Sequence, residues 1–370
     1  MLRPFLDVFW DEKVWLPPNT TWADVAPGPD KAVAYTNHWH VLYPIPMALV
    51  YTAIRFTMEN YVFAPFGRSL GVKEGRSKKV PNNPKLETAY RADPESKKII
   101  GLAKQLDMTE RQVERWWRLR RSQDKPSKLV KFCENMWKSA FLTYNFLCGV
   151  YILWDKEWLW DIDHCYIGHP HQGYTNGMWW YYMVTSAFYW SLLLSQFWDV
   201  RRKDFWQNFV HHLATISLIS FSWVLNAHRV GTLVILSHDP AEIFLEAAKA
   251  SKYAGYHKVC NCIFALFVLL WTVTRLGIYP FYIIWSLLFR APKLWSPILT
   301  FDVLIFLLCV LFALDVLWTW LILQVLYKSI KTGQVKGDIR SSSSEVSDSE
   351  NSHDSNHNTP NRVNNNMSDK

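Results

Sequence analysis

Long apolar stretches dominate this chain, and each is about as long as a helix that crosses a bilayer. The hydrocarbon core of a membrane is about 30 Å thick, so a crossing helix needs roughly 20 mostly apolar residues. The candidate stretches are residues 41–56, 136–154, 178–198, 208–225, 230–248, 259–285 and 299–327. Inside a membrane, a helix satisfies its own backbone hydrogen bonds. The sequence therefore predicts an all-α polytopic membrane protein with about seven transmembrane helices, the sixth kinked or ended by Pro280.

The tryptophan content supports a membrane location. The 370 residues include 21 Trp, and membrane proteins concentrate Trp and Tyr at both lipid–water interfaces. The mean hydropathy of -0.07 is that of a soluble protein, but it averages apolar helices with a polar insert and a polar tail. The six cysteines show no zinc-ribbon spacing, and most lie in or beside apolar stretches, so a disulfide framework is not expected.

Two adjacent apolar stretches carry ionisable residues, which are costly in hydrocarbon and usually face a bundle interior or a wet cavity. On the first stretch these polar residues are Asn208, His211, His212 and Thr215; on the second they are His238, Asp239, Glu242, Glu246 and Lys249. Each group falls within about 100° of a helix surface at 100° per residue. We therefore expect two polar stripes that face each other and line one site.

The order of motifs around these stripes resembles the signature of ceramide synthases, the TLC-domain N-acyltransferases. In sequence order, the motifs are Arg-Lys-Asp-Phe ending at Phe205, the His211–His212 pair, Asn-x-x-Arg-x-Gly-Thr-Leu-Val from Asn226, the His238–Asp239 pair, and Leu-Glu-Ala-Ala-Lys ending at Lys249. The resemblance covers residues 9–350. It departs at Glu242, where the family usually has Asp. It implies a six-helix bundle around a central tunnel.

The resemblance also implies an activity: transfer of a fatty acyl group from acyl-CoA to the amine of a sphingoid base, giving a ceramide. The amine must be neutral to attack, yet the pKa of a free amine is about 10.4, so a base is needed. We expect the catalytic residues to be His211, His212, His238 and Asp239. Two mechanisms are open. In the first, a histidine acts as a general base and Asp239 orients it. In the second, His211 is the nucleophile that first accepts the acyl group.

The predicted substrate-binding residues are Asn208, Arg229, Glu242, Glu246 and Lys249. A structural role is the alternative for two of them: Arg229 as an interface anchor, and Lys249 as a residue that snorkels to the membrane surface. Thr215 is expected to satisfy a backbone carbonyl in the turn above it. The predicted partners are acyl-CoA, a sphingoid base and the lipid bilayer. A homodimer or heterodimer is compatible with the sequence.

Two other functional classes are alternatives to an acyltransferase. A metal-dependent membrane lipid oxidase needs several His-x-x-His-His boxes, and the sequence has none; a mononuclear site from His211, His238 and Asp239 is the remaining metal alternative. A non-enzymatic TLC lipid sensor would not need the His-His and His-Asp pairs. These pairs favour catalysis, with acyl-CoA as a substrate and no metal or other cofactor.

A basic insert separates the first two apolar stretches. Residues 68–131 contain 18 Lys and Arg against 8 Asp and Glu. Residues 108–121 resemble the third helix of a homeodomain and residues 102–106 the second, whereas the first helix looks truncated. Thr109 and Gln112 form the pattern of a capping box. Leu119 occupies the position of the adenine-reading Asn, so sequence-specific DNA binding is not expected. Anionic lipid or acyl-CoA phosphates suit the basic face better.

The Lys and Arg bias of the loops predicts a lumenal N-terminus. The predicted order is a lumenal segment 1–40, a first transmembrane helix 41–66, a cytosolic insert 67–128, a TLC domain 129–328 and a disordered cytosolic tail 329–370, in the endoplasmic reticulum membrane. Asn19 begins an Asn-Thr-Thr glycosylation sequence. Ser342 and Ser347 have the acidic context of kinase sites. By resemblance, the loop at residues 290–297 bears on acyl-chain length.

Overall fold

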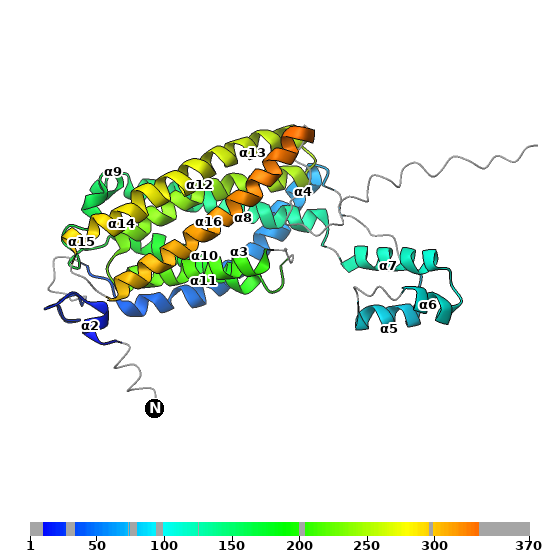
Figure 1. Ribbon diagram of the computed structural model, residues 1–370, viewed down its shortest axis with the longest axis horizontal. Coiled ribbons are helices and arrows are strands. Elements are labelled where there is room, and N and C mark those ends of the chain that lie inside the picture. The colour runs from blue at the N-terminus through cyan, green and yellow to red at the C-terminus, as the bar shows by residue number, and fades with distance from the viewer. Residues whose placement is uncertain are drawn as a thin grey trace, which may run out of the picture.

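The described part of the chain is helical, with no β-strand among its residues (Figure 1). The computed structural model describes residues 10–26, 34–72, 74, 80–93, 99–124, 126–199, 204–295 and 299–332. The all-α membrane architecture predicted from the apolar stretches is confirmed.

Each predicted transmembrane stretch lies on a long helix. The first helix runs continuously through η1 (His38–Leu42), α3 (Pro44–Met58), η2 (Glu59–Phe63) and α4 (Ala64–Ser69). The next four are α8 (Lys128–Leu153), α10 (Asn176–Ser195), α11 (Phe205–Val224) and α12 (His228–Tyr253). The sixth comprises α13 (His257–Trp271), η4 (Thr272–Ile284), α14 (Trp285–Phe289) and α15 (Ala291–Leu294), and the last is α16 (Leu299–Thr332).

Three described helices are long and apolar enough to cross a membrane by length and composition: His38–Ser69, His257–Leu294 and Thr300–Lys331. The helices α8, α10, α11 and α12 have 20 to 26 residues. At 1.5 Å per residue they are also long enough to cross, but they carry more polar residues. The number of helices that cross the bilayer stays a prediction.

The helix α12 is the centre of the bundle. It packs against α8, α11, α13 and η4, while α16 packs against α11 and η4. The outer face of α16 presents large apolar side chains, among them Phe306, Leu317 and Trp320. Such a surface is costly in water and suits contact with lipid chains.

Pro280 does not end its helix, which was one of the two outcomes expected for it. It lies in η4, a π-helical stretch between α13 and α14. In a π-helix each amide bonds to the carbonyl five residues earlier, so another amide can use the carbonyl that Pro280 leaves free. The helix continues to Leu294.

The insert forms a small three-helix unit of α5 (Pro84–Ala92), α6 (Ile99–Leu106) and α7 (Glu110–Asp124). Leu86, Tyr90, Val113, Trp116 and Trp117 form its core. The predicted capping box is confirmed: the Thr109 amide donates to Gln112 Oε1 at 2.9 Å, and the Gln112 amide donates to Thr109 Oγ1 at 3.3 Å.

One ion pair of the insert links its first and last helices. Arg120 of α7 donates to both carboxylate oxygens of Glu87 of α5. These hydrogen bonds lower the pKa of Glu87 below its usual value. An ion pair therefore joins the short helix α5 to α7, in addition to the apolar contacts between them.

Asn19 is exposed in the segment after α2 (Glu12–Trp15). In Figure 1 the helix α2 lies at one end of the bundle, and the insert lies beyond the other end. This arrangement is compatible with the predicted placement of the two regions on opposite sides of a membrane.

Candidate active site

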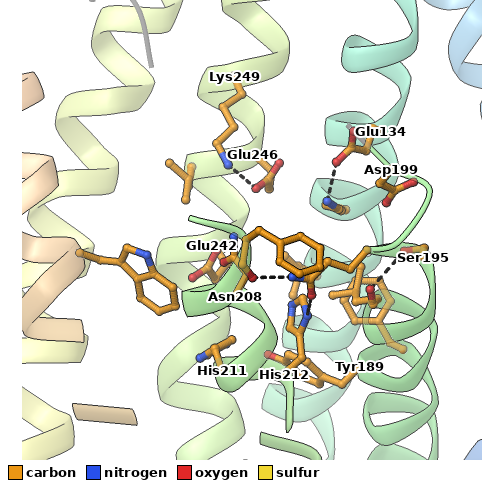
Figure 2. Close-up of a pocket in the computed structure, with 18 of the residues that line it drawn as sticks. Glu134, Tyr189, Ser195, Asp199, Asn208, His211, His212, Glu242, Glu246 and Lys249 are labelled. Carbon is orange, nitrogen blue, oxygen red and sulfur yellow. Dashed lines mark hydrogen bonds and ion pairs between the residues drawn. The ribbon is translucent and has the colours of Figure 1, made fainter. Parts of the chain in front are cut away.

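A polar cavity lies between α8, α10, α11 and α12 (Figure 2). Its polar and charged lining residues are Glu134, Lys138, Tyr189, Ser195, Gln196, Asp199, Asn208, His211, His212, Glu242, Glu246 and Lys249. Both predicted stripes contribute to this lining. The two adjacent helices therefore direct polar side chains into a common space, as their periodicity indicates.

An apolar pocket adjoins the polar cavity. Its lining residues include Thr215, Leu218, Ile219, Val230, Val234, Ile235, His238, Leu287, Trp295, Leu304, Leu308 and Leu311. Tyr189 and His211 line both spaces. His211 thus lies where a polar head group and an apolar chain would meet. Trp295 belongs to the loop at residues 290–297, of which 296 and 297 lie outside the described residues.

His211 has an unsatisfied ring nitrogen at this junction. Its Nδ1 is buried and has no hydrogen-bond partner among the residues that the structure describes, and the same is true of Thr215 Oγ1 one turn later. The expected bond from Thr215 to a backbone carbonyl is therefore not made. Buried polar atoms normally find partners, so these two are available to a substrate. The His211 ring packs edge-on against Trp318, with ring centroids 5.2 Å apart.

Gln196 determines the tautomer of His212. Nδ1 of His212 lies 3.1 Å from Gln196 Oε1. Because Gln196 Nε2 donates to the Phe205 carbonyl at 2.7 Å, the oxygen of its amide is the atom that faces the histidine. An amide oxygen only accepts, so Nδ1 carries the hydrogen and Nε2 is left as the atom that can accept a proton.

The structure gives Asp239 a different partner from the histidine that we expected. Its carboxylate accepts a hydrogen bond from Asn145 Nδ2 at 2.8 Å, and Thr185 Oγ1 donates to Asn145 Oδ1 at 2.9 Å. Consecutive residues of a helix point about 100° apart. Asp239 therefore faces α8 and α10, whereas His238 lines the apolar pocket.

A buried charge cluster lies behind His238. Arg275 of η4 donates to Asp315 Oδ1 of α16 at 3.0 Å, to Glu242 Oε1 at 3.1 Å and to the His238 carbonyl at 3.1 Å. One guanidinium thus joins three helices next to the cavities. Because Glu242 pairs with Arg275, its side chain is held between this cluster and the polar cavity.

Two further ion pairs lie in the polar cavity. Lys249 donates to Glu246 at 2.6 Å, and Lys138 of α8 donates to Glu134 at 2.7 Å. Lys249 therefore lies beside an acid and lines the cavity, rather than only reaching for the membrane surface.

No group of three or more His, Cys, Asp or Glu side chains within the described ranges could hold a metal ion. The absence of a metal or cofactor from the reaction remains a prediction.

Comparison with known proteins gives the family. The model of the TLC domain matches residues 131–324. Over 345 residues the chain is 41% identical to ceramide synthase 5 of Homo sapiens, covering 92% of this chain and 88% of that protein. The chain belongs to the ceramide synthase family. It is also 38% identical over 344 residues to ceramide synthase 3 of Homo sapiens (92% and 89% covered), and 34% identical over 350 residues to ceramide synthase hyl-1 of Caenorhabditis elegans (91% and 84% covered).

Membership of the ceramide synthase family confirms the resemblance carried by the sequence motifs. It does not favour a lipid oxidase or a non-enzymatic sensor.

Part of the ceramide synthase motif that begins at Asn226 has a structural role. Asn226 adopts a φ of 58° between α11 and α12, and its Nδ2 donates to the carbonyls of Pro170 and Gln172. A Cβ at Gly231 would overlap the Tyr182 hydroxyl, which donates to the His228 carbonyl at 2.9 Å. These residues hold the start of α12 against α10.

Arg229 of the same motif lies apart from both cavities. Its Nη1 donates to the His164 carbonyl at 2.8 Å, and its guanidinium lies 4.6 Å from the centroid of the Trp158 ring. This placement supports the anchor alternative over substrate binding.

Several residues of the site are not among those predicted from the sequence. Arg275 and Asp315 are ionisable residues inside apolar stretches, so the criterion that identified His211 could have found them. Tyr189, Gln196 and Asn145 had no comparable signal, because uncharged polar residues are common in membrane helices.

Proposed function

We propose that this chain transfers a fatty acyl group from acyl-CoA to the amine of a sphingoid base and forms a ceramide or dihydroceramide. One observation carries the proposal: His211 lines both the polar cavity and the apolar pocket. An acyl thioester has its reactive carbonyl between a polar CoA group and an apolar chain. The fatty acyl chain of the thioester suits the apolar pocket, and in that position its carbonyl lies beside His211.

The site supplies a base for the amine. A sphingoid ammonium must lose a proton before its nitrogen can attack, and His212 Nε2 is the acceptor left by the hydrogen bond to Gln196. Overall the ammonium loses two protons: one ends on the CoA thiolate and the other is released. Glu242 and Glu246 line the polar cavity, where their carboxylates can accept hydrogen bonds from the ammonium.

His211 has one of two roles in this scheme. It positions the thioester for direct attack by the amine, or it attacks the thioester itself and carries the acyl group until the amine takes it. An acylated His211 forms only in the second route. Incubation with acyl-CoA alone, followed by peptide mass analysis, distinguishes them.

We further propose that the protein lies in the endoplasmic reticulum membrane with Asn19 in the lumen and the insert in the cytosol. The Lys and Arg bias and the exposed Asn19 support this orientation. Ser342 and Ser347 lie outside the described residues, and their phosphorylation is likewise a proposal.

The test is product formation by the purified protein in lipid nanodiscs. It receives sphinganine and a mixture of acyl-CoAs, and the products are identified by mass. We expect N-acylated sphinganine, at an unchanged rate after treatment with a chelator. A folded protein that acylates no sphingoid base, or a rate abolished by the chelator and restored by iron, would contradict the proposal.

A further inference from the structure

His238 and Asp315 form a buried pair to which the proposed function gives no role. His238 Nε2 lies 3.9 Å from Asp315 Oδ2, and the two side chains are 7% and 1% exposed. Neither atom has a hydrogen-bond partner among the described residues. Two unsatisfied buried polar atoms that face each other are unusual in a protein interior.

The backbone of α12 determines where His238 carries its first hydrogen. Its Nδ1 lies 2.7 Å from the Val234 carbonyl, which can only accept. The Ser237 hydroxyl also donates to that carbonyl, at 2.9 Å, so Ser237 cannot donate to the ring. Nδ1 therefore carries a hydrogen, and Nε2 either has a bare lone pair or carries a second hydrogen.

The other side of the pair restricts this choice. Asp315 Oδ1 accepts from Arg275, which leaves Oδ2 directed at the histidine. A bare Nε2 and an ionised Oδ2 would repel each other, because neither has a hydrogen to donate. One proton between them removes this repulsion, either as a protonated carboxyl or as an imidazolium.

The surrounding charges also favour an added proton. The groups that face the pair are Arg275 and Tyr279 of η4, Glu242 of α12 and His211 of α11. Arg275 is the cation of this set, whereas Asp315 and Glu242 are acids. Uncompensated charge is costly in a buried site, so a proton on the pair lowers the free energy of the folded state.

We propose that Asp315 is the carboxylate partner of His238 and that the pair carries one added proton, on either the imidazole or the carboxyl. At 3.9 Å the two groups interact as charges and not through a hydrogen bond. Asp315 is thus a positioning residue. It holds the His238 ring in the wall of the apolar pocket that His211 also lines. This inference rests on the proposed function for its effect on turnover, but the added proton itself does not depend on the reaction.

The test is a double-mutant cycle on the protein in nanodiscs, with Asp315→Asn and His238→Asn. The asparagine at 238 keeps a donor near Nδ1 but has no counterpart of Nε2. Each variant should lower kcat by about tenfold or more, because it removes one partner of a buried charged pair that holds the His238 ring in place. The double variant should be no slower than the slower single variant, because both changes remove one interaction.

Glu246→Gln is the matched control, because Glu246 lies on the same helix and pairs with Lys249 rather than with Arg275. In the double variant with His238→Asn, the fold-losses in kcat of the two single variants should multiply, as for independent sites. If the fold-losses in kcat of Asp315→Asn and His238→Asn also multiply, Asp315 acts through Arg275 and not through His238. That result overturns the proposal.

An infrared difference spectrum between wild type and His238→Asn provides a readout without turnover. It should contain an imidazolium band or the carbonyl band of a protonated carboxyl, and this measurement remains available if Asp315→Asn does not fold. A spectrum with neither band overturns the added proton even when the wild type makes ceramide. A band in a protein that makes no ceramide supports the pair and refutes the proposed function instead.

Discussion

Tyr189 of α10 and His211 of α11 form the wall that the polar cavity and the apolar pocket have in common, with ring centroids 6.4 Å apart in an edge-on arrangement. The two rings therefore define the point at which a substrate changes from a polar to an apolar environment.

Removal of the Tyr189 ring should disturb this junction. Tyr189→Ala joins the two spaces and leaves the thioester carbonyl poorly held, so we expect kcat to fall by about tenfold or more. Tyr189→Phe keeps the ring and should stay within a few-fold of wild type. Steady-state kinetics with one acyl-CoA compares them. Equal losses in both variants would show that the hydroxyl, not the ring, is the important group.

Gln196 should affect catalysis through His212. Gln196→Leu removes the acceptor for Nδ1–H, so the base loses its preferred tautomer and kcat should fall by about tenfold. Gln196→Glu keeps an acceptor at that position and should recover most of the rate. Melting temperatures of both variants serve as the control for folding. If Gln196→Leu is as active as wild type, Gln196 does not contribute to catalysis.

Gly231→Ala should destabilise the protein. The added methyl group would overlap the Tyr182 hydroxyl, with Ser222 Oγ also only 2.9 Å away. Overpacking of this kind costs about 1–3 kcal/mol, which should appear as a lower melting temperature in detergent. Gly277→Ala is the matched control, since its nearest atom is 3.7 Å away. The idea fails if both variants melt at the wild-type temperature, or if Tyr182→Phe brings no recovery to Gly231→Ala.

The insert should bind polyanions without reading a base sequence. Arg111, Arg115 and Arg118 are exposed on α7, and contacts of such residues with phosphates weaken steeply as salt rises. We expect the protein in nanodiscs to bind two unrelated DNA duplexes with equal, salt-sensitive affinity. Nanomolar preference for one duplex at physiological salt would indicate a sequence reader.

The positions of the helices could be predicted from the sequence because apolar length alone identifies them. The shared cavity followed from the spacing of the polar stripes on α11 and α12. The partner of Asp239 could not be predicted, because Asn145 is 94 residues away in the chain and the rotation of α12 against α8 depends on packing. The same limit applies to Arg229, whose neighbours Trp158 and His164 lie in the segment between α8 and α10. Arg275 and Asp315 differ, since their charge within apolar stretches was visible.

The most direct test of the account is ceramide formation by three forms of the purified protein: wild type, His211→Ala and His212→Ala. With sphinganine and acyl-CoA in nanodiscs, we expect wild type to form the amide. Each alanine variant should be slower by about 100-fold or more, as for loss of a general base or nucleophile, at an unchanged melting temperature. Near-normal turnover in both folded variants would contradict the assignment of this site.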